Sequence, residues 1–205
     1  MFYTHVKATY EIMSVGSTYI AIFGSRTSSS SSNQFAFGYA AHQSPKLWRF
    51  DYESEHQALD SLTVGTELPW DGKHTISIDS NNGSILIDNN LINLGFPASI
   101  EASSVLPLYL FALNTNGTAG EIGNTRIYSF KLYDTNFNFM TEKPVLNLVP
   151  ARNSSGALGM YDTIGGKFYT NAGTGTFIAG PDTNPWKQAK DLWIKIDSTA
   201  WKQVF

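Results

Sequence analysis

The sequence from residue 74 to residue 88 reads His74-Thr75-Ile76-Ser77-Ile78-Asp79, then Ser80-Asn81-Asn82-Gly83, then Ser84-Ile85-Leu86-Ile87-Asp88. Apolar and polar residues alternate on both sides of the Asn-Gly pair, and this period of two is that of a strand with one buried face. Asn-Gly permits the positive φ values that a tight turn needs. The segment therefore predicts a β-hairpin in which Ile76 and Ile78 face Ile85 and Ile87.

A second hairpin is predicted on the N-terminal side of this one. Phe35, Phe37 and Tyr39 alternate with small residues, and Trp48, Phe50 and Tyr52 alternate with polar residues beyond a Gln43-Ser44-Pro45 turn. We expect further strands over residues 6–13, 18–24, 107–113, 125–134, 145–149, 159–162, 167–169 and 175–178. No helical spacing of apolar residues continues beyond two turns. Short strands with Gly, Asn, Ser and Pro between them favour an all-β, two-sheet antiparallel sandwich with jelly-roll topology.

The composition limits the classes of partner. Aromatic residues make up 14% of the 205 residues and charged residues 15%, so the chain has ample apolar surface for a core. A net charge of -3 without a Lys/Arg cluster predicts no binding of nucleic acid. We expect no membrane insertion, because no apolar run approaches the roughly 20 residues that span a bilayer. Cysteine is absent, which excludes disulfides and thiolate chemistry.

The amino-acid composition of the sequence changes after Gly180. Residues 181–185 read Pro-Asp-Thr-Asn-Pro, which is the chemistry of a linker, and the residues that follow are rich in Trp and Lys. We therefore expect one sandwich over residues 1–180 and a tail over residues 181–205. Alternation over residues 192–196 predicts a short C-terminal β-hairpin in the tail. An isolated hairpin is marginal in water, so the tail is expected to pack on its own sandwich, a second copy or another protein.

Residues 126–180 carry a series of motifs in a specific order. They are Arg126-Ile127-Tyr128-Ser129-Phe130-Lys131-Leu132-Tyr133-Asp134, Leu148-Val149-Pro150-Ala151-Arg152-Asn153, Gly156-Ala157-Leu158-Gly159-Met160-Tyr161-Asp162, Gly165-Gly166-Lys167-Phe168-Tyr169-Thr170-Asn171, Gly173-Thr174-Gly175 and Phe177-Ile178-Ala179-Gly180. This series resembles the C-terminal signature of laminin-G-like, concanavalin A-like domains of tailed-phage structural proteins and gut-bacterial surface proteins. Residues 22–28, 35–39 and 71–76 are also similar to that family. The resemblance implies a concanavalin A-like jelly roll.

The resemblance also implies a role in binding or attachment without catalysis. It favours a phage virion protein of a fibre, tail or capsid decoration that contacts a host surface glycan. The tail is similar to Trp/Lys hairpins of phage structural proteins, so we expect assembly through Trp186, Trp193 and Trp201, with another virion protein or as a homo-oligomer, a trimer being favoured. A bacterial cell surface or extracellular location is the alternative to the virion. A purely structural attachment module and a glycoside hydrolase-related domain are the alternative functions.

Sugar binding needs an aromatic face for stacking and fixed polar groups for the hydroxyls. The candidate ligand-binding residues are Arg26, Trp48, Tyr52, Trp70, Asn114 and Asn116. Most large aromatic residues in a sandwich of this size are buried, so core packing is the expected fate of the aromatic candidates. The polar groups in loops are therefore the stronger ones. The signature residues Arg152, Tyr161 and Asp162 are expected to be structural.

Carboxylates offer only a weak catalytic signal. The Glu-x-Asp-x-x-Glu spacing that places the acids of some glycoside hydrolases on one strand face is absent. Asp51, Glu53 and Glu55 share a face if the strand of Trp48 continues to residue 55, and three like charges on one face indicate a solvated strand. We therefore predict no enzymatic activity.

Metal binding is predicted only as a minor alternative. His5, His42, His56 and His74 stand singly, without the spacing of a metal site. The oxygen-rich segment from Asp79 to Asp88 has ligands suited to calcium, but the turn already explains its composition. The prediction is no cofactor, with calcium as the alternative.

Overall fold

The fold is all-β throughout the part of the chain that can be described. The computed structural model describes residues 5–27, 34–42, 47–53, 55–59, 69–79, 84–93, 106–133, 143–171, 176–179, 193–195 and 201–203, and every regular element among them is a strand. The chain divides into two compact units, residues 1–146 and 147–205. The predicted boundary after Gly180 falls in a segment outside the described residues.

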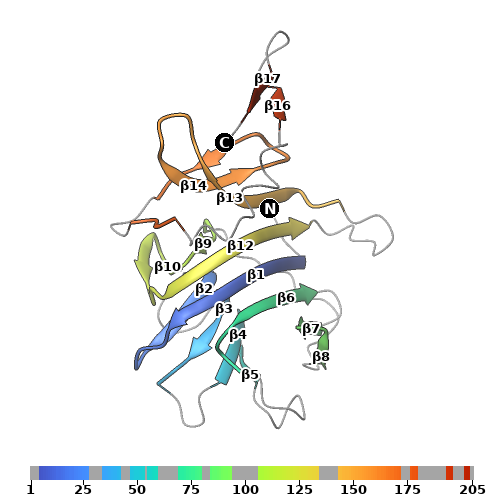
Figure 1. Ribbon diagram of the computed structural model, residues 1–205. Helices are drawn as coiled ribbons and strands as arrows, with labels where there is room; N and C mark the ends of the chain where they lie inside the picture. Colours follow the sequence, from blue (N-terminus) through green and yellow to red (C-terminus); the bar gives the residue numbers. More distant parts are fainter. Residues whose placement is uncertain are drawn as a thin grey trace. The chain divides into compact units, whose positions relative to one another are not determined.

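The first sheet of the first unit is antiparallel. Its strands lie in the order β12 (Asn124–Tyr133), β1 (His5–Ser14), β6 (Lys73–Asp79), β7 (Ser84–Ile87) and β8 (Asn90–Asn93) (Figure 1). The predicted hairpin of residues 74–88 is confirmed, because Ile76 pairs with Ile87 and Ile78 with Ile85. All four isoleucines are at most 1% exposed.

The second sheet of the first unit is mixed. Its strands lie in the order β11 (Thr118–Gly120), β10 (Leu113–Thr115), β2 (Tyr19–Arg26), β3 (Gln34–Ala40), β4 (Leu47–Glu53) and β5 (Glu55–Leu59), and β9 (Tyr109–Leu110) also pairs with β2. The predicted β3–β4 hairpin is confirmed by the pairs Phe37↔Phe50 and Tyr39↔Trp48.

The prediction of one strand over residues 107–113 is wrong in one respect. The chain forms two short strands there, because Phe111 adopts a positive φ of 66° and reverses its direction. As a result β9 runs antiparallel to β2, whereas β10 runs parallel to it. The expectation of two purely antiparallel sheets is corrected accordingly.

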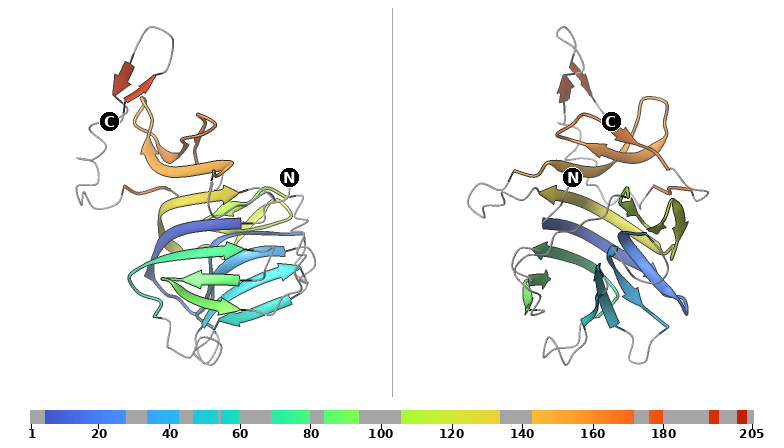
Figure 2. Two further views of the ribbon diagram at one scale, coloured as in Figure 1. Left: turned by 90° about the vertical axis from the view of Figure 1, so that its right-hand side faces the viewer. Right: turned by 180° about the vertical axis from the view of Figure 1, so that it is seen from behind.

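Aromatic rings join the two sheets of the first unit into a sandwich. Tyr10 on β1 lies 5.7 Å from Phe37 on β3 and 5.5 Å from Trp48 on β4, between ring centroids. Phe130 on β12 lies 5.3 Å from Phe23 on β2. Such pairs add about 0.5–1.5 kcal/mol each beyond the burial of their area. The two layers are visible in Figure 2, and the core lies between them.

The second unit is described mainly by an antiparallel sheet of β13 (Leu146–Arg152), β14 (Leu158–Asp162) and β15 (Phe168–Tyr169). The buried Asp162 carboxylate accepts hydrogen bonds from the backbone nitrogens of Asn147, Ile164 and Gly165 at 3.1, 3.1 and 2.9 Å. Arg152 donates from Nη1 to the Gly156 carbonyl at 3.1 Å. These two signature residues therefore hold the turns of this sheet.

Two further strands in the second unit, β16 (Trp193–Lys195) and β17 (Trp201–Gln203), pair antiparallel with Ile194 opposite Lys202. Within the described part of the chain, the structure contains no helix with the length and apolar character needed to cross a membrane.

Candidate functional site

A polar hollow of about 320 Å³ lies in the first unit. It is lined by Ser17, Thr18, Tyr19, Arg26, His42, Arg49, Asp51 and Glu121. Successive residues of a strand point to opposite faces of its sheet. Since Phe37 and Trp48 point into the core, their sequence neighbours Gly38 and Arg49, which pair with each other, lie on the outer face of the second sheet. We call this hollow the Tyr19 pocket.

Small residues on β3 bring Tyr19 close to the sheet. Ala36, Gly38 and Ala40 occupy the outer face of β3 and are buried. A Cβ added to Gly38 would lie 2.7 Å from both the Cζ and the hydroxyl of Tyr19. The tyrosine ring therefore packs directly on the Gly38 backbone, in space that any other residue type would fill.

The Tyr19 hydroxyl is buried and has no hydrogen-bond partner among the described residues. Burial raises the pKa of Tyr19 well above its ordinary value; Asp51 and Glu121 raise it further, and Arg49 and Arg26 oppose them. Tyr19 is therefore neutral at physiological pH. Its hydroxyl lies within the field of all four charged side chains of the pocket.

The first charged pair of the pocket is Arg49 with Asp51. Arg49 Nε forms an ion pair with Asp51 Oδ1, and the side chains are 19% and 3% exposed. The Arg49 guanidinium also lies over the Tyr19 ring, 5.5 Å from its centroid. Both residues come from β4, where alternation places them two residues apart on the same face.

The second charged pair is Arg26 with Glu121, whose Nη2 and Oε1 atoms lie 3.7 Å apart. Arg26 Nε also donates to Thr115 Oγ1 at 2.9 Å. Glu121 has a positive φ of 52°, and its carbonyl accepts a hydrogen bond from the Ala21 nitrogen at 2.9 Å. Backbone contacts to β2 thus hold Glu121 beside the pocket.

The pocket offers hydrogen-bond donors and acceptors with little net charge. Its two guanidinium groups and two carboxylates cancel in formal charge. Guanidinium groups only donate, carboxylates only accept, and the hydroxyls of Ser17, Thr18 and Tyr19 do both. This arrangement suits a polar ligand that has both kinds of group.

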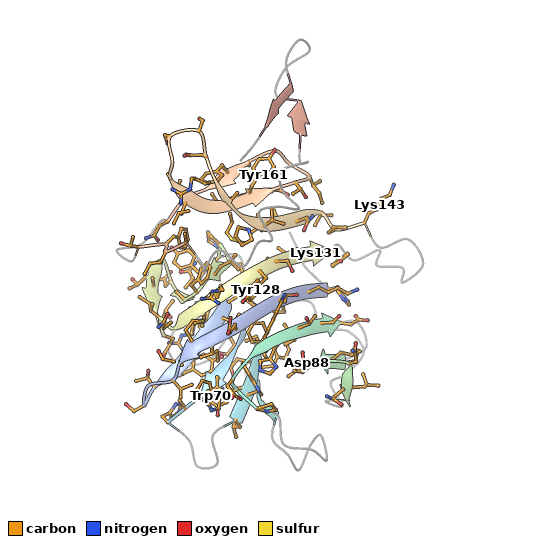
Figure 3. All side chains as sticks on the ribbon, in the orientation of Figure 1. Trp70, Asp88, Tyr128, Lys131, Lys143 and Tyr161 are labelled. Carbon is orange, nitrogen blue, oxygen red and sulfur yellow. The ribbon has the colours of Figure 1, made fainter. Side chains whose placement is uncertain are left out.

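Of the sequence-predicted aromatic candidates whose side chains the structure describes, Trp48 and Trp70, neither lines the Tyr19 pocket. Trp48 is 0% exposed, its ring stacks on Phe37 at 5.3 Å, and its Nε1 donates to the Pro69 carbonyl at 3.3 Å. Its ring faces the core, as expected for most aromatic residues of a sandwich. Trp70 is partly exposed, 6.5 Å from the Tyr39 ring (Figure 3). The side chain of Tyr52 lies outside the described residues.

Of the polar candidates, only Arg26 lines the pocket. Asn114 is 0% exposed and holds a loop, because its Nδ2 donates to the Pro107 carbonyl and its Oδ1 accepts from the Gly117 nitrogen, both at 2.7 Å. Asn116 occupies a turn with a φ of 48°, and its nitrogen donates to the Arg26 carbonyl at 3.0 Å. Both asparagines therefore support the segment that carries Glu121.

The assembly candidates fall in the part of the second unit that is least described. Trp193 begins β16 and Trp201 begins β17. Trp186 and the side chains of the other two lie outside the described residues, so their assembly role stays a prediction.

The predicted acidic face of Asp51, Glu53 and Glu55 does not form. β4 ends at Glu53 and β5 begins at Glu55, and the chain reverses between them so that Glu55 pairs with Tyr52. Asp51 is buried against Arg49, whereas sequence reasoning expected a solvated strand. The correction follows from the hairpin, which ends the strand before the three carboxylates can share a face.

The proposed calcium ligand Asp88 has protein partners for both carboxylate oxygens. Its Oδ1 accepts from the Thr75 nitrogen at 2.7 Å, and its Oδ2 lies 2.6 Å from His74 Nδ1. His74 Nε2 lies 2.9 Å from the Asp71 carbonyl. In the described ranges, no group of three or more His, Cys, Asp or Glu side chains is placed to hold a metal ion.

Sequence reasoning missed most of the pocket, namely Tyr19, Arg49, Asp51 and Glu121. A usable signal existed for three of them. β3 has large residues on one face and only Ala or Gly on the other, and the neighbouring strand has Arg and Asp two residues apart. This pattern indicates an outer face with a hollow and charged walls. Glu121 comes from a distant loop, and no local pattern places it there.

Comparisons of this chain with protein-family models, with curated proteins and with solved structures found no match.

Proposed function

We propose that this protein is a non-enzymatic binding module that takes a surface glycan in the Tyr19 pocket. The observation that carries the proposal is the partly exposed pair of Arg26 and Glu121 in the pocket wall, whose Nη2 and Oε1 atoms lie 3.7 Å apart. This separation is too long for a hydrogen bond. A ligand hydroxyl that enters the pocket could accept from Arg26 and donate to Glu121.

The chemistry of the walls supports a saccharide. Each sugar hydroxyl both donates and accepts a hydrogen bond, so it can bridge a guanidinium and a carboxylate. Hydrogen bonds to charged groups are stronger than neutral ones, at about 1.5–3 kcal/mol. Arg26, Arg49, Asp51 and Glu121 offer such partners around one hollow.

We propose further that the first unit and its C-terminal signature form a concanavalin A-like jelly roll, and that residues 181–205 form an assembly hairpin of a tailed-phage virion protein. The motif series of residues 126–180 supports the topology and the setting. The antiparallel pairing of β16 with β17 supports the hairpin.

A glycan array probed with the fluorescently labelled full-length chain tests the binding function. We expect a defined set of hits that the Arg26→Met variant loses. An array without hits, from a chain that forms a stable oligomer, would replace glycan binding with purely structural attachment.

Light scattering on the full-length chain tests assembly. We expect a defined oligomer that the double substitution Trp193→Ser and Trp201→Ser converts to a folded monomer. A wild-type monomer would remove the homo-oligomer from the proposal.

A further inference from the structure

We infer that the ligand of the Tyr19 pocket is a neutral, hydroxyl-rich saccharide and not an acidic or sulfated one. This inference rests on the proposed function and narrows its ligand class. It is drawn from the charge balance of the pocket walls, from the covering of its one tyrosine ring and from the unfilled hydrogen-bonding capacity of Arg26.

Charge balance is the first step. Each guanidinium of the pocket has a carboxylate beside it, Arg49 with Asp51 and Arg26 with Glu121. An anionic ligand would therefore approach two carboxylates together with two guanidinium groups, and the opposing Coulomb terms leave little net attraction. The negative charge of an acidic glycan therefore adds no binding free energy in this pocket.

The second step concerns stacking. Tyr19 is the one Phe, Tyr or Trp among the described residues that line the pocket. Arg49 lies over its ring at 5.5 Å, and the hydroxyl end of the ring packs on Gly38. Because Arg49 already covers the ring, we expect recognition through ligand hydroxyls and not through the apolar face of a sugar.

The third step concerns unfilled hydrogen-bonding capacity. Among the described residues, the terminal nitrogens of Arg26 have one ion pair, with Glu121 at 3.7 Å, and this separation is too long for a hydrogen bond. A ligand hydroxyl between Arg26 and Glu121 would accept from the first and donate to the second, and this bridging needs a neutral group with both functions.

The volume sets the size of the bound group. A pocket of about 320 Å³ is at the lower end of the range of roughly 300–1,000 Å³ for small-molecule sites. We expect it to hold a short terminal segment of a glycan.

Titration calorimetry with the full-length chain tests the inference. The neutral probes are lactose, maltotriose and cellotriose, and the acidic probes are sialyllactose, trigalacturonate and a heparin tetrasaccharide. We expect at least one neutral probe to bind with an affinity that changes less than about twofold between about 0.05 M and 0.5 M salt, because no net charge is neutralised. The acidic probes are expected to bind more weakly.

A matched pair of variants locates the binding. Arg26→Met should weaken binding of the neutral ligand about 10- to 100-fold, because it removes the donor of a charged hydrogen bond. Its control is Arg126→Met, because Arg126 pairs with Glu11 at 2.8 Å on the other sheet.

Each outcome decides one level of the argument. Tighter binding of acidic probes that weakens with salt would overturn the neutral ligand and leave glycan binding standing. Binding that Arg26→Met leaves unchanged would place the ligand outside this pocket and overturn the inference. No binding by any probe would remove the proposed function itself.

Discussion

The inner and outer faces of β2, β3 and β4 are built from alternate residues of the same strands, yet they differ in every physical respect. The inner face presents Phe23, Phe37 and Trp48, all 0% exposed and packed ring to ring. The outer face presents Gly38 and the Arg49–Asp51 pair beside a hollow. One period of two thus separates a face packed with aromatic rings from a face of small buried residues with the charged walls of the hollow at its side.

The energetics of the two faces differ as well. Burial of aromatic area on the inner face is favourable, at about 25 cal/mol per Å². On the outer face a nearly buried ion pair and a buried hydroxyl lose hydration, and a buried ion pair is weak evidence for stability. We therefore expect substitutions on the inner face to change stability, and substitutions on the outer face to change binding more than stability.

Trp48→Ala should disrupt the packing of the inner face and give the largest loss in the free energy of unfolding. Loss of a buried Trp costs about 3–5 kcal/mol in the free energy of unfolding. Urea unfolding followed by circular dichroism measures it. Arg26→Met on the outer face should cost less, about 1 kcal/mol, because its ion pair with Glu121 is partly exposed and only one hydrogen bond, to Thr115, is lost. Equal losses for the two variants would show that the faces are not functionally distinct.

Gly38→Ala should damage the contact between β2 and β3. Its Cβ would lie 2.2 Å from the Ile20 carbonyl oxygen and 2.7 Å from the Tyr19 ring and hydroxyl, so both the β2 backbone and the ring must move. Overpacking of this kind costs about 1–3 kcal/mol, and we expect binding of the neutral saccharide to fall as well. Gly120→Ala is the control, because a Cβ there meets nothing within 4 Å. A Gly38→Ala variant as stable as the wild type would contradict the close approach of Ile20 and Tyr19 to Gly38.

The inner face could be predicted from the sequence, and the outer site mostly could not. Alternation predicted that Ile76 and Ile78 face Ile85 and Ile87, and it predicted the hairpin of β3 with β4 without its register, because a hairpin is set locally by its turn and its apolar period. The pocket instead joins Tyr19 to Glu121, which are far apart in the sequence. Such a contact depends on which strands become neighbours, and neither segment encodes that choice by itself.

The break at Phe111 shows the same limit on a smaller scale. Alternation over residues 107–113 predicts one strand, and the positive φ of Phe111 is rare for a bulky residue. The hydrogen bond from its nitrogen to the Ile22 carbonyl at 2.9 Å supplies part of the compensation. Tertiary pairing with β2 therefore overrides the local pattern and brings the segment of residues 113–121 beside Arg26.

Tyr10→Phe in the core and Tyr19→Phe on the outer face should have similar effects on the free energy of unfolding. Each removes a buried hydroxyl that has no partner among the described residues, so we expect each variant to be about 1 kcal/mol more stable than wild type or equal to it. Thermal unfolding at neutral pH measures the change. A loss of more than about 1 kcal/mol in Tyr19→Phe alone would reveal a partner for its hydroxyl in the free protein.

Alkaline pH gives the smallest effect and tests the same two hydroxyls without a ligand. Burial raises the pKa of Tyr10 and of Tyr19 well above 10.0, so both keep their protons in the folded state while the unfolded chain releases them near pH 10. The stability they contribute is therefore complete below pH 10 and is lost as the pH rises beyond it.

At about pH 10.5 the loss is under about 1 kcal/mol for each tyrosine, and it grows with pH as long as the folded protein holds the proton. The urea midpoint of unfolding, measured between pH 8 and pH 10.5, follows this loss of stability. Each single Tyr→Phe variant is expected to lose about half as much stability as the wild type over this range, because one of the two tyrosines remains. The double variant should show the flattest profile. If only Tyr10→Phe flattened the profile, the Tyr19 hydroxyl would have access to solvent in the free protein, and the close packing of the Tyr19 ring on Gly38 would be contradicted.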